Sequence, residues 1–74
     1  MGTNVETVNN NVQELRLKAS VTQEVLGDEV GVTRQTIIAI ERGNYTPSVL
    51  LALKISHFFK TPVETVFKIS YGKK

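Results

Sequence analysis

Residues 23–42 read QEVLGDEVGVTRQTIIAIER, and this stretch decides the fold. On both sides of Gly31 its apolar residues recur at the three- and four-residue spacing of a helix. A threonine stands before each half, and a threonine hydroxyl can accept an unpaired backbone N–H of the first helical turn. Gly31 supplies the positive φ with which helices commonly end. The stretch therefore predicts two short helices, at 23–30 and 34–42, joined by a turn of about three residues.

The apolar residues of this stretch give both helices an inner side. We expect the seam between the two crossing helices to consist of Leu26, Val30, Ile37 and Ile40. Val25 is expected on the same inner side, and Val32 fills the inside of the turn. The small residue Gly27 lets the second helix approach the first. This is the pattern of a helix-turn-helix.

The outer side of the second helix carries residues that can read DNA bases. The predicted base-reading residues are Thr33, Arg34, Gln35, Ile38 and Ala39. Arg34 can donate two hydrogen bonds to guanine O6 and N7, and Gln35 can pair with adenine N6 and N7. Ala39 or Ile38 can pack on a thymine methyl group. Two other interpretations remain: Arg34 and Gln35 as plain surface residues, and Ile38 as the edge of the core or part of a protein interface.

Polar residues beside the two helices can contact the DNA backbone. The predicted phosphate-binding residues are Thr22, Gln23, Arg42, Asn44 and Tyr45, together with the hydroxyl of Thr33. Contacts of this kind set the register of a protein on DNA and carry no sequence preference.

Three further helices complete the predicted fold. The first covers about residues 10–19, where an asparagine cluster can cap its start; its inner stripe is Val12, Leu15 and Ala19. The next covers about 48–59; its inner face is Val49, Leu51, Ala52, Ile55, Phe58 and Phe59. Residues 61–64, Thr-Pro-Val-Glu, form a capping box with proline at the first helical position and predict a last helix through Val66 or Phe67. We therefore expect an all-α, compact five-helix domain.

The two ends of the chain are expected to differ from this domain. We divide the chain into a flexible N-terminal arm at 1–9, a DNA-binding domain at 10–67 and a C-terminal tail at 68–74. Residues 67–71 alternate between apolar and polar, as a strand does, but need a pairing partner. Either the same segment of a second copy or the stretch Asn4–Val8 can supply it. The predicted dimerisation residues are Leu50, Phe67, Ile69 and Tyr71, with partly buried core as the alternative for Leu50.

Composition limits the classes of function. The 74 residues include no cysteine and one histidine, His57, so disulfides, thiolate metal sites and a histidine metal cluster are excluded. No nucleophile with its base, no paired carboxylates and no phosphate-binding glycine loop are present, which argues against an enzyme, and we expect no cofactor, metal or small-molecule effector. No apolar stretch is long enough to span a membrane, and we expect a cytoplasmic protein, associated with the nucleoid when bound to DNA.

Charge is distributed unevenly along the chain. Residues 1–29 carry two basic and five acidic side chains, whereas residues 30–74 carry seven basic and two acidic ones. This asymmetry fits either a face turned toward a polyanion or an ordinary mixed surface.

The motifs together resemble the Cro and phage-repressor class of helix-turn-helix regulators, the Xre family. The resemblance covers about residues 10–67 and is carried by Val21-Thr22-Gln23-Glu24, Gly31-Val32-Thr33-Arg34-Gln35-Thr36-Ile37, Ile40-Glu41-Arg42-Gly43, Pro47-Ser48, Leu53-Lys54-Ile55, Phe58-Phe59, Val63-Glu64 and Val66-Phe67. It implies a five-helix, lambda-repressor-like domain, usually dimeric on a near-palindromic operator and most often repressing transcription. The chain departs from the family at Gly27, where alanine is usual, at Leu50, where a polar residue is common, and at Lys60, where glycine is common.

Two functions of different classes follow. The first is a homodimeric repressor that acts by occupying double-stranded DNA. The second is an antitoxin-like protein-interaction module that also binds DNA, and copurification with a second protein would favour it.

Overall fold

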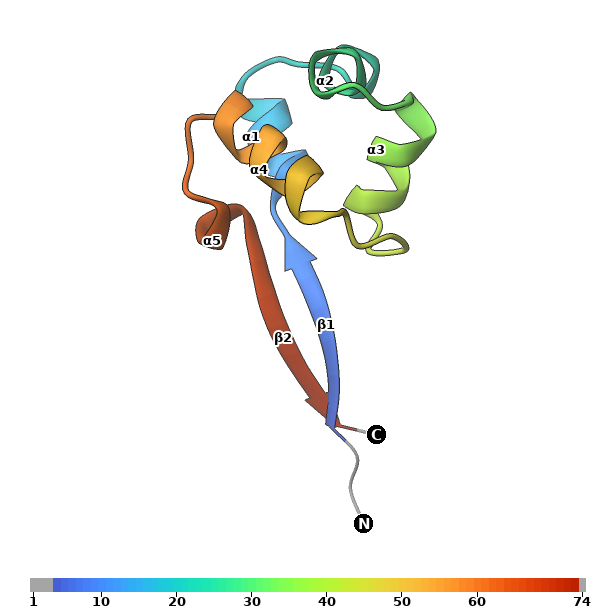
Figure 1. The fold of residues 1–74 in the computed structure, drawn as a ribbon, viewed down its shortest axis with the longest axis vertical. Coiled ribbons are helices and arrows are strands. Elements are labelled where there is room, and N and C mark those ends of the chain that lie inside the picture. Colours follow the sequence, from blue (N-terminus) through green and yellow to red (C-terminus); the bar gives the residue numbers. More distant parts are fainter. Residues whose placement is uncertain (1–3, 74) are drawn as a thin grey trace.

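The fold is a body of five short helices from which a two-stranded ribbon extends (Figure 1). The computed structural model describes residues 4–73. Its elements are β1 (Asn4–Asn10), α1 (Val12–Lys18), α2 (Gln23–Val30), α3 (Arg34–Glu41), α4 (Val49–Phe58), α5 (Val63–Val66) and β2 (Phe67–Lys73). The predicted helices are all present, each within two residues of its expected start and end.

Side-chain caps fix the starts of the three central helices, as predicted for α2 and α3. The hydroxyls of Thr22, Thr33 and Ser48 accept the backbone N–H three residues on, at 3.1, 3.3 and 3.1 Å. Gly31 and Gly43 follow α2 and α3 with φ of +82° and +78°. The predicted turn is therefore built from local signals that the residues themselves carry.

The start of α5 differs from the prediction. Pro62 stands at the N-cap and not at the first helical position, and no side chain caps this helix. The Thr61 hydroxyl donates to the carbonyl of Phe59 at 2.9 Å, so it is turned back toward the end of α4 and does not close a capping box. Lys60 lies between them with φ +53°, a left-handed conformation that reverses the chain at this point. Lys60 therefore takes the backbone shape for which glycine is usual.

A single apolar core joins the helices. Its buried members are Val12, Leu26, Val30, Ile37, Ile40, Leu51, Ile55 and Val66. The predicted seam of the helix-turn-helix is entirely buried. Gly27 is buried too, and a Cβ built on it would lie 2.7 Å from the carbonyl oxygen of Val32, so the absence of a side chain lets the turn before α3 pack closely against α2.

Three predicted inner residues lie outside. Ala19 is exposed, and Val25 and Val49 are 46% and 77% exposed. Helices of seven to ten residues contact their neighbours along a narrow stripe, because successive positions on a helix turn by about 100°. By contrast, two polar residues that were not predicted to be internal, Arg16 and Ser56, are buried, with exposed fractions of 7% and 1%.

The ribbon is formed within the chain. β1 and β2 are antiparallel, with Val8 opposite Ile69 and Glu6 opposite Tyr71. Of the two predicted partners for the C-terminal strand, the N-terminal stretch is the one observed, and residues 4–9 are a strand where a flexible arm was expected. Residues 1–3 lie outside the described residues. Where the ribbon joins the helices, the Asn11 N–H donates to the carbonyl of Val66 at 3.1 Å, which continues the pairing of the strands to the start of α1 and the end of α5.

Candidate nucleic-acid interface

The five predicted base-reading residues all belong to α3 or its N-cap. Thr33, Arg34 and Gln35 are exposed at the first turn, and Ile38 and Ala39 are half-buried one turn later. The helix buries the opposite side, at Ile37 and Ile40, in the core. The exposed side therefore begins with a polar turn and continues into an apolar one.

The cap of α3 holds that polar turn in place. The Thr33 hydroxyl accepts the Thr36 N–H and also lies 3.2 Å from the Thr36 hydroxyl. The backbone N–H groups of Arg34 and Gln35 precede the first bonded turn, so they remain free of the helix ladder. Local geometry thus presents both side chains at the start of the helix.

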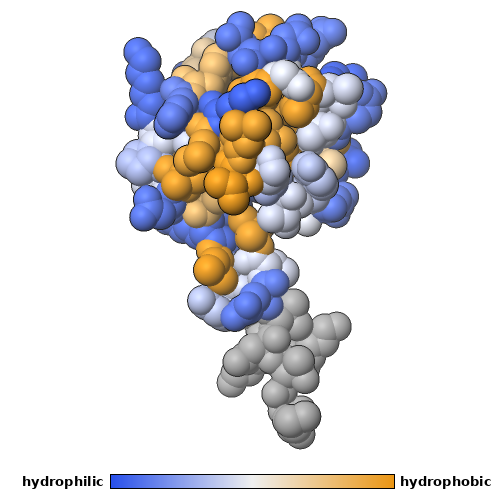
Figure 2. All heavy atoms as spheres, viewed as in Figure 1, coloured by the Kyte–Doolittle hydropathy of each residue, from blue (hydrophilic) through white to orange (hydrophobic). Residues whose placement is uncertain are grey.

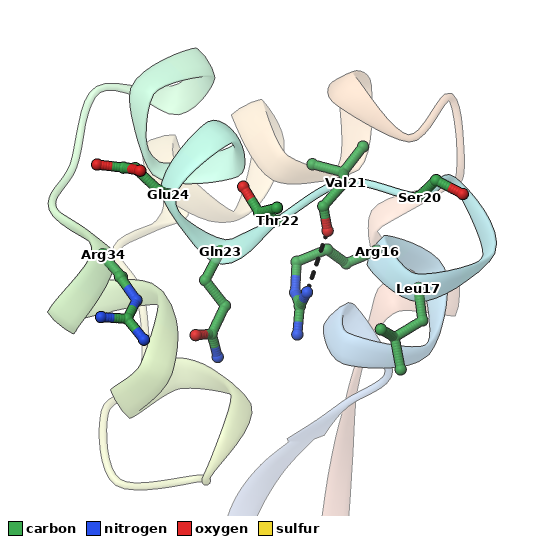
Figure 3. A pocket seen from close by; sticks show the side chains of 8 residues that line it. All are labelled: Arg16, Leu17, Ser20, Val21, Thr22, Gln23, Glu24 and Arg34. Carbon is green, nitrogen blue, oxygen red and sulfur yellow. Dashed lines mark hydrogen bonds between the residues drawn. The ribbon is translucent and has the colours of Figure 1, made fainter.

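Figure 3 shows how Arg34 lies relative to the start of α2. Its side chain and that of Gln23 come from different helices and face the same open space. This hollow has a volume of about 610 Å³, and its lining is Arg16, Leu17, Ser20, Val21, Thr22, Gln23, Glu24 and Arg34. A second hollow of about 240 Å³ shares Gln23 and Arg34 and continues past Ile38 to Arg42. The two hollows therefore adjoin at Gln23 and Arg34, between the start of α2 and the exposed side of α3.

Arg16 in the lining of the first hollow and Glu41 in the lining of the second form a largely buried ion pair. Arg16 donates through Nε to Oε2 of Glu41 at 2.7 Å and through Nη2 to Oε1 at 3.2 Å. The side chains of Arg16 and Glu41 are 9% and 4% exposed. Arg16 also donates through Nη1 to the carbonyl of Val21 at 3.0 Å. One guanidinium thus connects α1, the start of α2 and the end of α3.

Gln23 is connected to the same ion pair. Its Nε2 donates to Oε1 of Glu41 at 3.0 Å, which fixes the side chain in the position seen in Figure 3. One N–H of the amide is used in this bond, and the second remains available. The residue predicted to contact phosphate is therefore held by the helix that carries the predicted base-reading residues.

Neither member of the ion pair was predicted from the sequence. Arg16 lies four residues after buried Val12, on the same stripe of α1, and Glu41 lies four residues after buried Ile37, on the same stripe of α3. A charged residue on an apolar stripe was the available signal, and pairing one basic with one acidic residue on such stripes would have found them.

The remaining predicted site residues lie at two places. Thr22 is exposed at the start of α2, and Arg42, Asn44 and Tyr45 are exposed in the segment that follows α3. Of the predicted dimerisation residues, Leu50, Ile69 and Tyr71 are 64%, 62% and 67% exposed, which removes Leu50 from the core of this chain. Phe67 is half-buried and packs against the core.

Among residues 4–73, no three His, Cys, Asp or Glu side chains gather where they could hold a metal ion. The same residues contain no helix with the length and apolar character needed to cross a membrane.

Comparison with known proteins gives a consistent set of matches. A helix-turn-helix family model matches residues 12–66. The uncharacterized HTH-type transcriptional regulator YgzD of Bacillus subtilis is 57% identical over 58 residues, which are 78% of this chain and 88% of YgzD. The uncharacterized HTH-type transcriptional regulator MJ0272 of Methanocaldococcus jannaschii is 48% identical over 58 residues, with the same coverage of 78% and 88%.

Two solved structures are similar in fold. The P22 c2 repressor, solved in complex with a synthetic operator, has a TM-score of 0.70 and 26% identity over 72% of this chain and 80% of its own. The transcriptional regulator VanUg has a TM-score of 0.71 over 90% of this chain and 89% of its own, and its 16% identity makes it a likeness of fold alone.

Proposed function

We propose that this chain, which belongs to the Xre-like helix-turn-helix family of transcriptional regulators, binds double-stranded DNA sequence-specifically with α3 in the major groove. The observation that carries the proposal is the exposed first turn of α3, where Arg34 and Gln35 stand free on one side and the core holds the other. Side chains at the start of such a helix reach the base edges. The family is one of DNA-binding regulators and not of enzymes.

Base reading is assigned to α3. Arg34 pairs with guanine and Gln35 with adenine, each through two hydrogen bonds, while Thr33 reaches the adjacent base or phosphate. Ile38 and Ala39 are half-buried, which leaves enough surface for contact with a thymine methyl group.

Phosphate binding is assigned to polar residues at the start of α2 and in the segment that follows α3. Gln23 offers its remaining amide N–H, held in position by Glu41, and Thr22 lies at the N-terminal end of α2, where backbone N–H groups are unpaired. Arg42, Asn44 and Tyr45 contact the backbone on the other side of α3. These contacts position the protein on the duplex without reading its sequence.

The regulator acts as a homodimeric repressor on a near-palindromic operator. One recognition helix covers only a few base pairs, and specificity in a genome generally needs two half-sites. The likeness to the P22 c2 repressor, whose solved complex contains a synthetic operator, supports this assignment. A protein with this role acts in the cytoplasm, at the nucleoid.

Selection of bound sites from a random duplex pool tests the proposal. We expect enrichment of a near-palindrome whose half-sites are about one helical turn, roughly 34 Å, apart. The double variant Arg34→Ala/Gln35→Ala should lose the enrichment. Lys68→Ala, which removes one positive charge from the ribbon, should keep it. Recovery of a pool without any enriched sequence would contradict sequence-specific binding.

A further inference from the structure

Four residues of α1 and of the turn after it line the two hollows beside α3. Arg16, Leu17 and Ser20 line the first hollow, and Gln13 lines the second. Gln13, Arg16 and Leu17 are three and four residues apart, so they lie on one side of α1. We call these four residues the α1 edge. In Figure 3 the α1 edge lies on the opposite side of the first hollow from Arg34.

The guanidinium of Arg16 has two hydrogen-bond donors left on this edge. An arginine side chain carries five N–H groups in a planar fork. The bonds to Glu41 and to the carbonyl of Val21 use three of them, and residues 4–73 supply no partner for the other two, one on Nη1 and one on Nη2. Figure 3 shows the guanidinium between Gln23 and Leu17, at the first hollow. Because the side chain is bonded to two partners and only 9% exposed, the guanidinium is held in this position.

The two remaining N–H groups suit a phosphate group. Guanidinium and phosphate commonly pair through two parallel hydrogen bonds. The ion pair with Glu41 balances the charge of Arg16 but leaves these donors unused, and Arg34 adds a positive charge to the lining of the hollow. The carboxylate of Glu24, the acidic residue of this lining, lies on the side of Arg34 and away from Arg16 (Figure 3). An anion can therefore approach Arg16 without meeting that carboxylate.

The face around α4 offers less to a phosphate. Apolar side chains gather on the face of the body where α4 lies (Figure 2), and Val49 and Leu50 are 77% and 64% exposed. A phosphate that loses water against such a face gains no hydrogen bond in exchange, which costs free energy. A DNA backbone is therefore expected on the side of the hollows.

We infer that Arg16 binds a phosphate of the DNA backbone in the first hollow, so that α1 is a third element of the interface beside α2 and α3. The inference rests on the proposed function, because it takes α3 to lie in the major groove. That groove is about 12 Å wide and is bounded by two phosphate backbones, so a surface that flanks the inserted helix faces phosphates. The α1 edge flanks α3 across a hollow of about 610 Å³, which has room for a phosphate group and its neighbouring sugars.

The test follows the side-chain N–H resonances of Arg16 by NMR while the full chain is titrated with the selected duplex. The titration is repeated with duplexes in which one phosphate at a time is replaced by an uncharged methylphosphonate. We expect the unmodified duplex to shift the Arg16 resonances and one modified duplex to abolish the shift. The dissociation constant should rise roughly 10-fold for that duplex, because a charge-assisted hydrogen-bond pair is lost.

Two variants that differ only at residue 16 show whether this loss depends on Arg16. Glu41→Gln keeps the guanidinium and an oxygen that accepts from it, whereas Arg16→Gln/Glu41→Gln lacks the guanidinium and leaves no buried charge unpaired. The 10-fold effect of the sensitive phosphate should persist in the first variant and fall below about two-fold in the second. Lys18→Met removes a positive charge from a side chain of α1 that is 72% exposed, and it should leave the whole series unchanged. Circular dichroism verifies that each variant is folded, and the resonances of the unsubstituted chain give the answer if a variant is not.

Inorganic phosphate, titrated in the same way, distinguishes a DNA phosphate from a free ion. A shift of the Arg16 resonances with inorganic phosphate but not with the duplex would overturn the inference, as would a sensitive phosphate whose effect is the same with and without Arg16. If the duplex binds and the Arg16 resonances do not move, the inference fails while the proposed function stands. If no duplex binds, both fail.

Discussion

The guanidinium of Arg16 in α1 donates to both carboxylate oxygens of Glu41, at the end of α3, with both side chains less than a tenth exposed. Removing one partner leaves a buried charge unpaired, so we expect Arg16→Ala to lower the free energy of unfolding by about 3–5 kcal/mol. Urea denaturation measures this. The double variant Arg16→Met/Glu41→Met should lose less than Arg16→Ala alone, because no charge remains buried. If the two substitutions lowered the free energy of unfolding additively in the double variant, a buried ion pair would be contradicted.

Arg34→Ala should leave the thermal melt unchanged, because the side chain is exposed and supports no core residue. Binding should weaken by roughly 1–3 kcal/mol, and the preference at one base position of each half-site should relax. Titration of the selected site and of single-base variants measures both. Unchanged preference at every position would remove Arg34 from base reading.

Gln23→Ala should weaken binding to all sequences by about the same factor, because this residue is assigned to phosphate. It also removes a donor to Glu41, and we expect a loss of about 1 kcal/mol in stability. The same titrations, compared with the urea denaturation, separate the two effects. A change in base preference would mean that Gln23 reads sequence.

Ile40→Ala should destabilise the domain by about 2–5 kcal/mol, since Ile40 is fully buried in the seam between α2 and α3. This is a large share of the stability of a domain of this size. Leu17→Ala, at an exposed position of α1, is the control and should change stability by less than about 0.5 kcal/mol. Equal melting of the two variants would place Ile40 outside the core.

Lys60→Gly should stabilise the domain by about 0.5–1 kcal/mol. The left-handed conformation of Lys60, with φ +53°, costs a residue with a Cβ about 1–2 kcal/mol, and the greater chain entropy of glycine in the unfolded state offsets part of the gain. Lys60→Ala is the matched control and should bring no gain. If Lys60→Gly melted at or below the wild-type temperature, the left-handed conformation would not be a source of strain at Lys60.

Prediction from sequence succeeded where the signals are local. The starts of α2 and α3 and the turn between them follow from Thr22, Thr33 and Gly31, whose roles depend on neighbours three or four residues away. The four seam residues followed from helical spacing. The base-reading and phosphate-binding assignments remain predictions, although the structure places Gln23 and Arg34 around one hollow.

Prediction failed where the outcome depends on distant parts of the chain. Val49 has the same local pattern as a core residue, and only the packing direction of α4 leaves it exposed. The burial of Arg16 depends on Glu41, 25 residues away. The start of α5 was misplaced because the left-handed turn at Lys60 redirects the Thr61 hydroxyl.

The pairing of Asn4 with Lys73 also constrains the order in which the molecule assembles. Each helix can form from contacts a few residues apart, but the ribbon closes a loop that contains nearly the whole chain, and closing a long loop costs entropy before any contact repays it. The helical body shortens that loop by holding Asn11 against Val66. We therefore expect the strands to pair from the body outward, late in folding.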